Sequence, residues 1–121
     1  MATVLIAGHS AVQRQTIAQT LQDSGYKVAH AATACETWGQ LLDTAIDVLV
    51  LAGGLDTLDP TALVAAVRNN RFLQRLPIIA VDERPTQDPQ IQGWLPREYL
   101  PDDLLDLLVV LLPRPMGGRQ R

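Results

Sequence analysis

The stretch DVLVLAGGLD, residues 47–56, decides the fold. Within it, Val48–Ala52 is apolar without interruption, which is typical of a strand buried on both faces of a parallel sheet. Gly53 and Gly54 then indicate a turn. In open parallel sheets, ligands bind beyond the carboxyl ends of the strands. This strand therefore brings only the methyl group of Ala52 to the edge where chemistry usually occurs.

Outward from this strand, short apolar runs alternate with helical patterns. Further strands are predicted at 3–7, 26–31, 76–81 and 94–95. Helix starts are predicted at capping boxes and at proline-acid pairs, namely Ser10 with Gln13, Thr33 with Glu36, Asp59 with Pro60, and residues 101–103. The first helix is expected to pack on the sheet through its apolar residues, Val12, Ile17, Ala18 and Leu21. The alternation predicts an α/β fold in which helices cover both faces of a parallel sheet.

Composition narrows the class of protein. The chain has 121 residues, 47% hydrophobic and 19% charged, which fits one folded domain. A formal net charge of −3 argues against nucleic-acid binding by this domain. Cys35 is the single cysteine, so an intrachain disulfide and a thiolate-based metal site are excluded. No signal peptide or membrane-length apolar run is visible, so we expect a cytoplasmic protein that does not enter a membrane.

Four segments of the chain resemble one known family. They are VLIAGHSAVQR (4–14), DVLVLAGGLDTLDP (47–60), LPIIAVDE (76–83) and WLPREYLPDDLL (94–105). As a set they are similar to the receiver domain of bacterial two-component response regulators. The resemblance implies a flavodoxin-like (CheY-like), doubly wound, five-stranded parallel sheet of strand order 2-1-3-4-5. It predicts a receiver-like domain over 1–112, followed by a flexible tail or linker at 113–121 that would suit an effector domain after residue 121.

The residues that carry the family's chemistry are mostly replaced. By the resemblance, the acidic pair that binds Mg²⁺ falls on Gly8 and His9, and the phosphoacceptor aspartate falls on Ala52. The conserved Ser/Thr falls on Asp82, and the lysine falls on Arg97. A methyl group cannot act as the nucleophile that an acyl phosphate requires. The sequence therefore predicts a pseudoreceiver without enzyme activity, cofactor or metal, which signals in a two-component or phosphorelay setting through protein contacts.

Three other interpretations of the same edge stay open. Asp56 lies in the loop after Ala52 and could accept a phosphoryl group. His9, Asp56 and Asp82 could together bind a metal ion. Arg97 could instead form an ion pair with Asp82 or Glu83, filling the pocket so that neither cation nor phosphate is needed.

The interval DERPTQDPQIQGW, residues 82–94, departs from the family pattern. Pro85, Pro89 and Gly93 interrupt it, and proline disrupts helix interiors. We therefore expect the family's fourth helix to be short or absent. An alternative function follows from this expectation, because the vacated space, lined by Trp94, Ile91 and the last helix, would suit a sensor of small ligands.

The last helix is unusually apolar, with leucine or valine at 104, 105 and 107–112. A surface helix usually shows one apolar stripe, so the excess predicts a protein partner or a homodimer that covers this helix. The expected interaction surface consists of Trp94, Tyr99, Leu104, Leu108 and Leu111.

Overall fold

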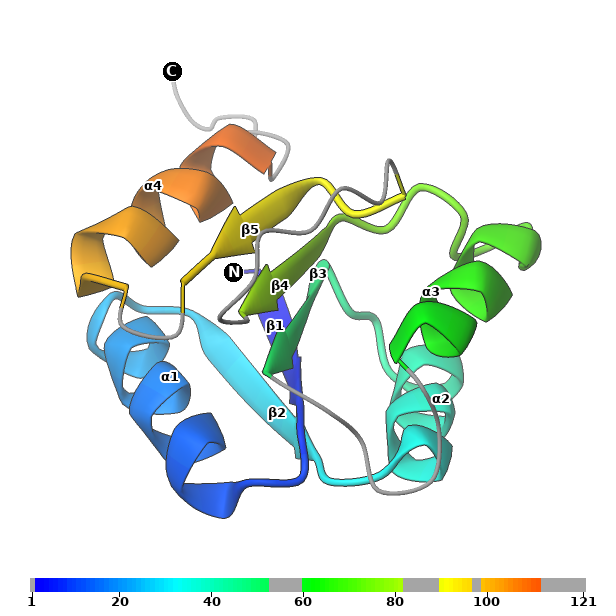
Figure 1. The fold of residues 1–121 in the computed structure, drawn as a ribbon, viewed down its shortest axis with the longest axis horizontal. Helices are drawn as coiled ribbons and strands as arrows, with labels where there is room; N and C mark the ends of the chain where they lie inside the picture. The colour runs from blue at the N-terminus through cyan, green and yellow to red at the C-terminus, as the bar shows by residue number, and fades with distance from the viewer. Residues whose placement is uncertain (1, 53–59, 82–89, 97–98, 112–121) are drawn as a thin grey trace.

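The chain folds as five parallel strands and four helices within the residues that the computed structural model describes, 2–52, 60–81, 90–96 and 99–111 (Figure 1). The strand order is β2-β1-β3-β4-β5, and every neighbouring pair is parallel. This confirms the predicted fold class. In chain order the elements are β1 (Thr3–Ala7), α1 (Ala11–Asp23), β2 (Lys27–Ala31), α2 (Ala34–Asp43), β3 (Val48–Ala52), α3 (Pro60–Asn69), β4 (Ile78–Val81), β5 (Gly93–Leu95) and α4 (Pro101–Leu111).

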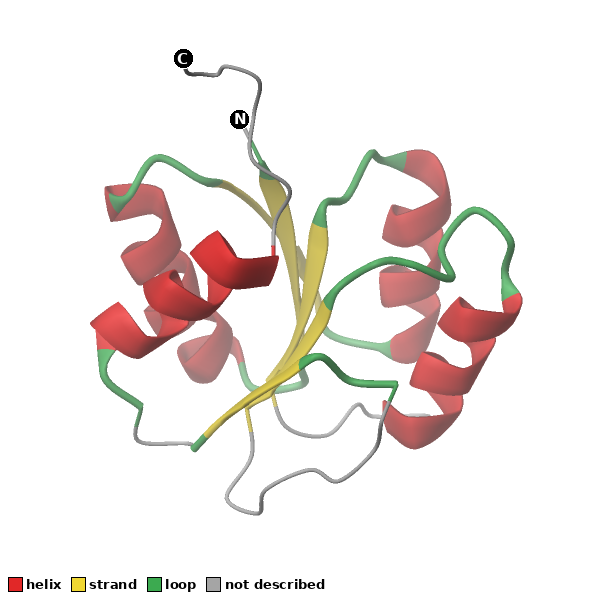
Figure 2. Ribbon diagram, turned by 90° about the horizontal axis from the view of Figure 1, so that it is seen from above, coloured by secondary structure: helices red, strands yellow, loops and turns green. Residues whose placement is uncertain are grey.

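The helices form two layers around the sheet. α1 and α4 cover one face, and α2 and α3 cover the other (Figures 1 and 2). β3 is the central strand, and all five of its residues are buried, as its uninterrupted apolar run predicts. Val48, Val50 and Ala52 belong to the core under α1 and α4, whereas Leu49 and Leu51 belong to the core under α2 and α3. The alternation of side chains along a strand thus divides one apolar run between two cores.

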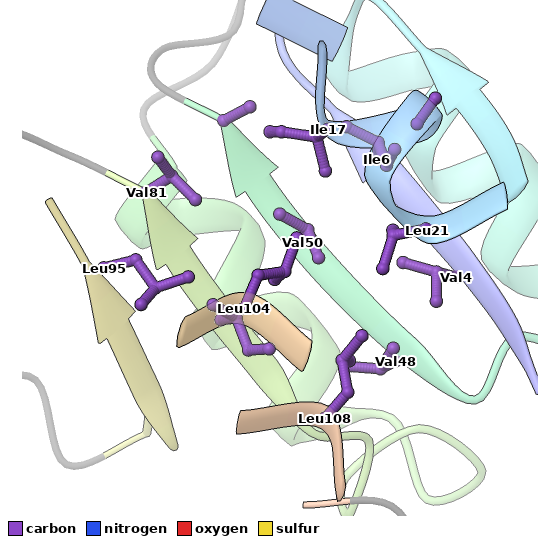
Figure 3. Packing of buried hydrophobic residues seen from close by; sticks show 13 residues of the cluster. Val4, Ile6, Ile17, Leu21, Val48, Val50, Val81, Leu95, Leu104 and Leu108 are labelled. Carbon is purple, nitrogen blue, oxygen red and sulfur yellow. The ribbon is translucent and has the colours of Figure 1, made fainter. Parts of the chain in front are cut away.

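α4 contributes directly to the first of these cores. Leu104 and Leu108 have no exposed surface, and their side chains lie over the strands close to Val48 and Val50 (Figure 3). Full burial of a leucine side chain contributes about 1.5–3 kcal/mol to folding. α4 is therefore an integral part of the fold.

The predicted helix caps are confirmed where the structure describes them. Ser10 Oγ accepts a hydrogen bond from the Gln13 N–H at 3.2 Å. Thr33 Oγ1 accepts from the Glu36 N–H at 3.1 Å, and the Glu36 carboxylate in turn accepts from the Ala32 N–H at 2.7 Å. The N–H groups of Gln13 and Glu36 are among those that an α-helix leaves without partners in its first turn, and the Glu36 contact also fixes the chain just before the Thr33 cap.

The link from β4 to β5 is only partly described, because residues 82–89 lie outside the described ranges. The predicted loss of the fourth helix falls mainly on those residues and stays a prediction. The described remainder, 90–92, is turn and irregular chain that leads straight into β5. The Gln92 N–H donates to the Ile78 carbonyl at 3.0 Å, and Gln92 Oε1 accepts from the Ile78 N–H at 2.8 Å. Gln92 therefore fixes the start of β5 beside the start of β4.

Arg68, in the last turn of α3, joins three separate segments. Its guanidinium donates to the carbonyl oxygens of Gln74 at 2.9 Å and Leu76 at 2.7 Å, before β4. It also donates to the Gln90 carbonyl at 3.1 and 2.6 Å and to Gln92 Oε1 at 2.7 Å, before β5. The planar, five-donor geometry of arginine suits such a multiple contact. Arg68 thus connects α3 to the segments that precede β4 and β5.

The tail predicted at 113–121 lies outside the described residues, so the domain boundary at 112 stays a prediction. Within the described part of the chain, no helix has the length and apolar character needed to cross a membrane.

Candidate functional site

The carboxyl edge of the sheet is formed by the residues that end or follow the central strands. β1 and β3 are neighbours with Ala7 opposite Leu51, so Gly8 follows beside Ala52. The Gly8 N–H donates to the Ala31 carbonyl at 3.0 Å, which continues the pairing of β1 with β2. Gly8 and Ala52 are buried, whereas His9 is exposed. At its centre, this edge therefore presents backbone and one methyl group.

Gly8 and Ala52 are in direct contact. A Cβ atom placed on Gly8 would lie 2.4 Å from the Ala52 carbonyl oxygen and 3.2 Å from both the carbonyl carbon and the Cβ of Ala52. The nearest of these atoms belongs to the backbone of a central strand, which cannot rotate away as a flexible side chain can. Any side chain at position 8, a carboxylate included, would therefore require a shift of one strand against the other.

Arg14 is a component of this edge that the sequence did not single out. Its Nη1 donates to the Gly8 carbonyl, and its Nε is buried without a hydrogen-bond partner. Burial, and second the charge of Arg14, lower the pKa of His30 below its ordinary value of 6.5. The spacing of Arg14, four residues after the cap Ser10, was the available signal, because a long helical side chain leans back over the preceding turn.

A hollow of about 390 Å³ lies between α1 and the segment that follows β5. The Tyr99 hydroxyl and Gln13 Nε2, from two lining residues, are buried without hydrogen-bond partners. Burial also raises the pKa of Tyr99 above its ordinary value of 10.0, so its hydroxyl stays protonated. Ser10, another lining residue, already serves as the α1 cap. The lining residues are His9, Ser10, Val12, Gln13, Thr16, Ile17 and Tyr99.

Comparison with solved structures finds close matches to this arrangement. The chemotaxis response regulator CheY4 of Vibrio cholerae superposes with a TM-score of 0.82 at 28% identity, over 93% of this chain and 99% of that chain. The structural neighbours of this chain are receiver domains. A putative response regulator from Chloroflexus aurantiacus matches with a TM-score of 0.82 at 21% identity, over 91% of this chain and 97% of that chain.

The receiver domain of a sensor histidine kinase from Pseudomonas aeruginosa also matches, with a TM-score of 0.82 at 19% identity, over 91% of this chain and 96% of that chain. That structure contains a magnesium ion coordinated in its active-site cleft. At 21% and 19% identity, the likeness to these last two structures shows the fold alone. No protein-family model matches the sequence, and a search of curated proteins finds no match.

Among the described residues, the carboxyl edge of the sheet does not fit a magnesium ion. Mg²⁺ prefers hard oxygen ligands in octahedral geometry. Gly8 has no side chain, Ala52 has a methyl group, and the Arg14 guanidinium adds a positive charge beside Gly8. In the described ranges there is also no group of three or more histidine, cysteine, aspartate or glutamate residues that could bind a metal.

The remaining residues predicted for this edge lie in segments that the structure does not describe. These are Asp56, Asp82, Glu83 and Arg97. The phosphoryl-accepting role of Asp56, the metal site with His9, and the ion pair of Arg97 with Asp82 or Glu83 therefore stay predictions.

The interaction surface predicted on the last helix needs correction. Leu104 and Leu108 are fully buried against the sheet, so a partner cannot reach them in this fold. Leu111 is partly buried against the same core. The sequence overestimated the uncovered apolar surface, because Leu105, Leu107 and Leu111 also pack, partly buried, against the same core as Leu104 and Leu108. Among the described residues of α4, the apolar side chains that remain exposed are Val109 at 59% and Val110 at 77%.

Trp94 is separated from α4 by the sheet. A Cβ on its neighbour Gly93 would lie 3.3 Å from the Leu107 side chain, so this position faces α4. Alternation along β5 then directs the partly buried Trp94 to the opposite face. Ile91 packs against the core under α2 and α3. Neither residue lines either of the two hollows that the described residues form around His9 and around His30, and the ligand-sensor alternative stays a prediction.

Proposed function

We propose that this chain is a pseudoreceiver: a cytoplasmic, non-enzymatic signalling module of two-component type that accepts no phosphoryl group and acts through protein contacts. The likeness to CheY4 at 28% identity over nearly the whole of both chains supports the receiver type. The observation that carries the loss of chemistry is the contact between Gly8 and Ala52. It leaves neither a nucleophile nor space for a metal-binding carboxylate at those two positions.

The contact surface that we propose is the outer face of α4, defined by Asp102, Asp103, Asp106, Val109 and Val110, all of which are exposed. It replaces the surface predicted from Leu104 and Leu108. Two exposed valines beside three carboxylates can bind a partner that is both basic and apolar. A module of this kind signals by binding a partner protein or dissociating from it, with no covalent step of its own.

The phosphorylation part of this proposal is tested by intact-mass spectrometry after incubation with acetyl phosphate and Mg²⁺. We expect no added mass of one phosphoryl group, because Ala52 supplies no carboxylate. An authentic receiver domain treated in parallel is the positive control. A stoichiometric, hydroxylamine-sensitive adduct on the native chain would contradict the proposal, and loss of that adduct in Asp56→Asn would assign it to Asp56.

A further inference from the structure

The loop after α3 is a compact basic and aromatic surface. Arg71, Phe72 and Arg75 are exposed there, and we call these three residues the basic loop. Phe72 is the only phenylalanine of the chain, yet 88% of it is exposed. No aspartate or glutamate occurs between residues 60 and 81, although the chain as a whole has a formal net charge of −3. The basic loop is therefore a positively charged surface on a chain whose net charge is negative.

This loop is anchored at its base. The Phe72 N–H donates to Asn70 Oδ1 at 2.8 Å, and the Leu73 N–H donates to the Asn70 carbonyl at 3.0 Å. Arg68 donates to the Gln74 carbonyl at 2.9 Å, and Leu73 packs against the core. A loop fixed in this way loses little conformational entropy when a partner binds. Phe72 is thus exposed on an ordered support.

The outer face of α4 has the opposite character. At about 100° per residue, its five members fall within an arc of about 120°, opposite the buried Leu104 and Leu108. Its first half is acidic and its last turn is apolar. Asp106 lies about one turn before Val109 and Val110, so a carboxylate and an apolar patch are adjacent along a single stripe.

We propose that the outer face of α4 binds the basic loop of a second copy of this chain. This inference rests on the proposed function, because it names the partner of the surface assigned there. Arg71 and Arg75 match the carboxylates of α4 in charge, and Phe72 matches Val109 and Val110 in apolar character. Such complementarity favours encounter and fixes the orientation of the complex.

The arrangement of the two surfaces makes the contact head-to-tail. α3, which the basic loop follows, covers one face of the sheet, and α4 covers the other (Figure 2). One chain can therefore offer its loop to one neighbour and its α4 to another. Head-to-tail contacts produce rings or open chains of subunits. A symmetric pairing of two α4 helices is disfavoured, because it would place the three carboxylates against each other or against valines.

The test uses two broken variants and their mixture. Variant one carries Arg71→Glu, Phe72→Ser and Arg75→Glu, and variant two carries Asp106→Arg and Val110→Ser. By light scattering, we expect the native chain to show a mass that rises with concentration. Each variant alone should associate about tenfold more weakly or stay monomeric, and an equimolar mixture should form a heterodimer and no larger species, because only one intact pair of surfaces remains.

Circular dichroism checks that both variants fold, and Lys27→Glu, an exposed charge reversal on β2, is the matched control that should associate as the native chain does. Added salt should weaken the native association, because the contact contains exposed charges.

Self-association of variant one at native strength would overturn the inference and indicate symmetric α4 pairing, leaving the proposed function standing. Monomers under all conditions, or a mixture that stays monomeric, would overturn it as well. The phosphorylation test above is independent of either result.

Discussion

At the scale of single residues, the centre of the carboxyl edge of the sheet has no polar side chain at Gly8 or Ala52. Gly8 and Ala52 together have one side-chain carbon, and they touch through atoms of the main chain. Neither residue, as it stands, offers a side-chain oxygen to a cation. A side chain at Gly8 would meet the Ala52 carbonyl, and a side chain larger than methyl at Ala52 would lie beside a residue that has no side chain. The present edge is therefore a packed structural junction.

This junction predicts an unusual cost for a small substitution. Gly8→Ala should lower the free energy of unfolding by about 1–3 kcal/mol, because its Cβ must displace the backbone of a central strand. The measurement is urea unfolding followed by circular dichroism. Gly39→Ala is the matched control: no atom lies within 4 Å of its added Cβ, and alanine is favoured within helix α2, so that variant should be more stable by about 0.5–1 kcal/mol. Equal effects at the two glycines would contradict a close contact at Gly8.

Protonation of His30 should make the stability of the fold depend on pH. His30 is an exposed residue, and the slight burial of its ring, and then the charge of Arg14, lower its pKa in the folded state below the ordinary 6.5. As the pH falls through that value, the unfolded chain binds a proton before the folded chain does. Stability should therefore decrease below about pH 6.5, and His30→Gln should remove this part of the decrease. The check is the difference in urea midpoint between the two proteins from about pH 7.5 to 5.5, and parallel curves would refute the assignment to His30.

At the scale of elements, the described chain around the β4–β5 link is organised by one side chain. Arg68 contacts the segments before both strands, so it connects pieces that are up to 24 residues apart in sequence. The same side chain supports the basic loop through Gln74. Its location links the stability of β4 and β5 to the position of Phe72.

Replacing Arg68 should therefore affect more than local charge. Arg68→Ala is expected to lower the free energy of unfolding by about 2 kcal/mol, because several hydrogen bonds worth about 0.5–1.5 kcal/mol each are lost together. Arg68→Lys should recover only part of this, since one ammonium group cannot serve the same set of acceptors. Urea unfolding at a low protein concentration is the measurement, and Arg71→Ala, at an exposed neighbour, is the control. If Arg68→Ala were as mild as the control, the connecting role would be wrong.

At the scale of the whole molecule, the sequence predicted the sheet better than the helix surfaces. Uninterrupted apolar runs placed β1, β3 and β4, whose residues are mostly buried, and the alternating pattern of residues 26–31 placed β2 at an edge of the sheet. In α1, Ile17, Ala18 and Leu21 are buried as predicted, but Val12 is 78% exposed. Five residues before Ile17, Val12 points about 140° away from it, so a sparse apolar pattern did not define the buried face.

The sequence could predict which residues occupy the candidate site, but it could not predict how they contact one another. Gly8 and Ala52 can be read directly from a sequence compared with the family pattern. The contact between them, the approach of Arg14 and the burial of Tyr99 depend on distances between separate elements, which local patterns do not contain. The burial of Leu104 and Leu108 is of the same kind, because it depends on which side of α4 packs on the core.

The whole molecule offers a last test, through its stability in the presence of Mg²⁺. A ligand that binds only the folded state stabilises it, and at about ten times its Kd it adds about 1.4 kcal/mol. For a domain of this size, that increment would raise the Tm by about 5 °C. We expect millimolar Mg²⁺ to leave the Tm of this chain unchanged, because Gly8 and Ala52 offer no side-chain oxygen and Arg14 places a cation beside them. An authentic receiver, measured by the same calorimetric scan, should show the increase. A comparable increase here, abolished by replacing Asp56 or Asp82 with asparagine, would mean that carboxylates outside the described residues restore a cation site.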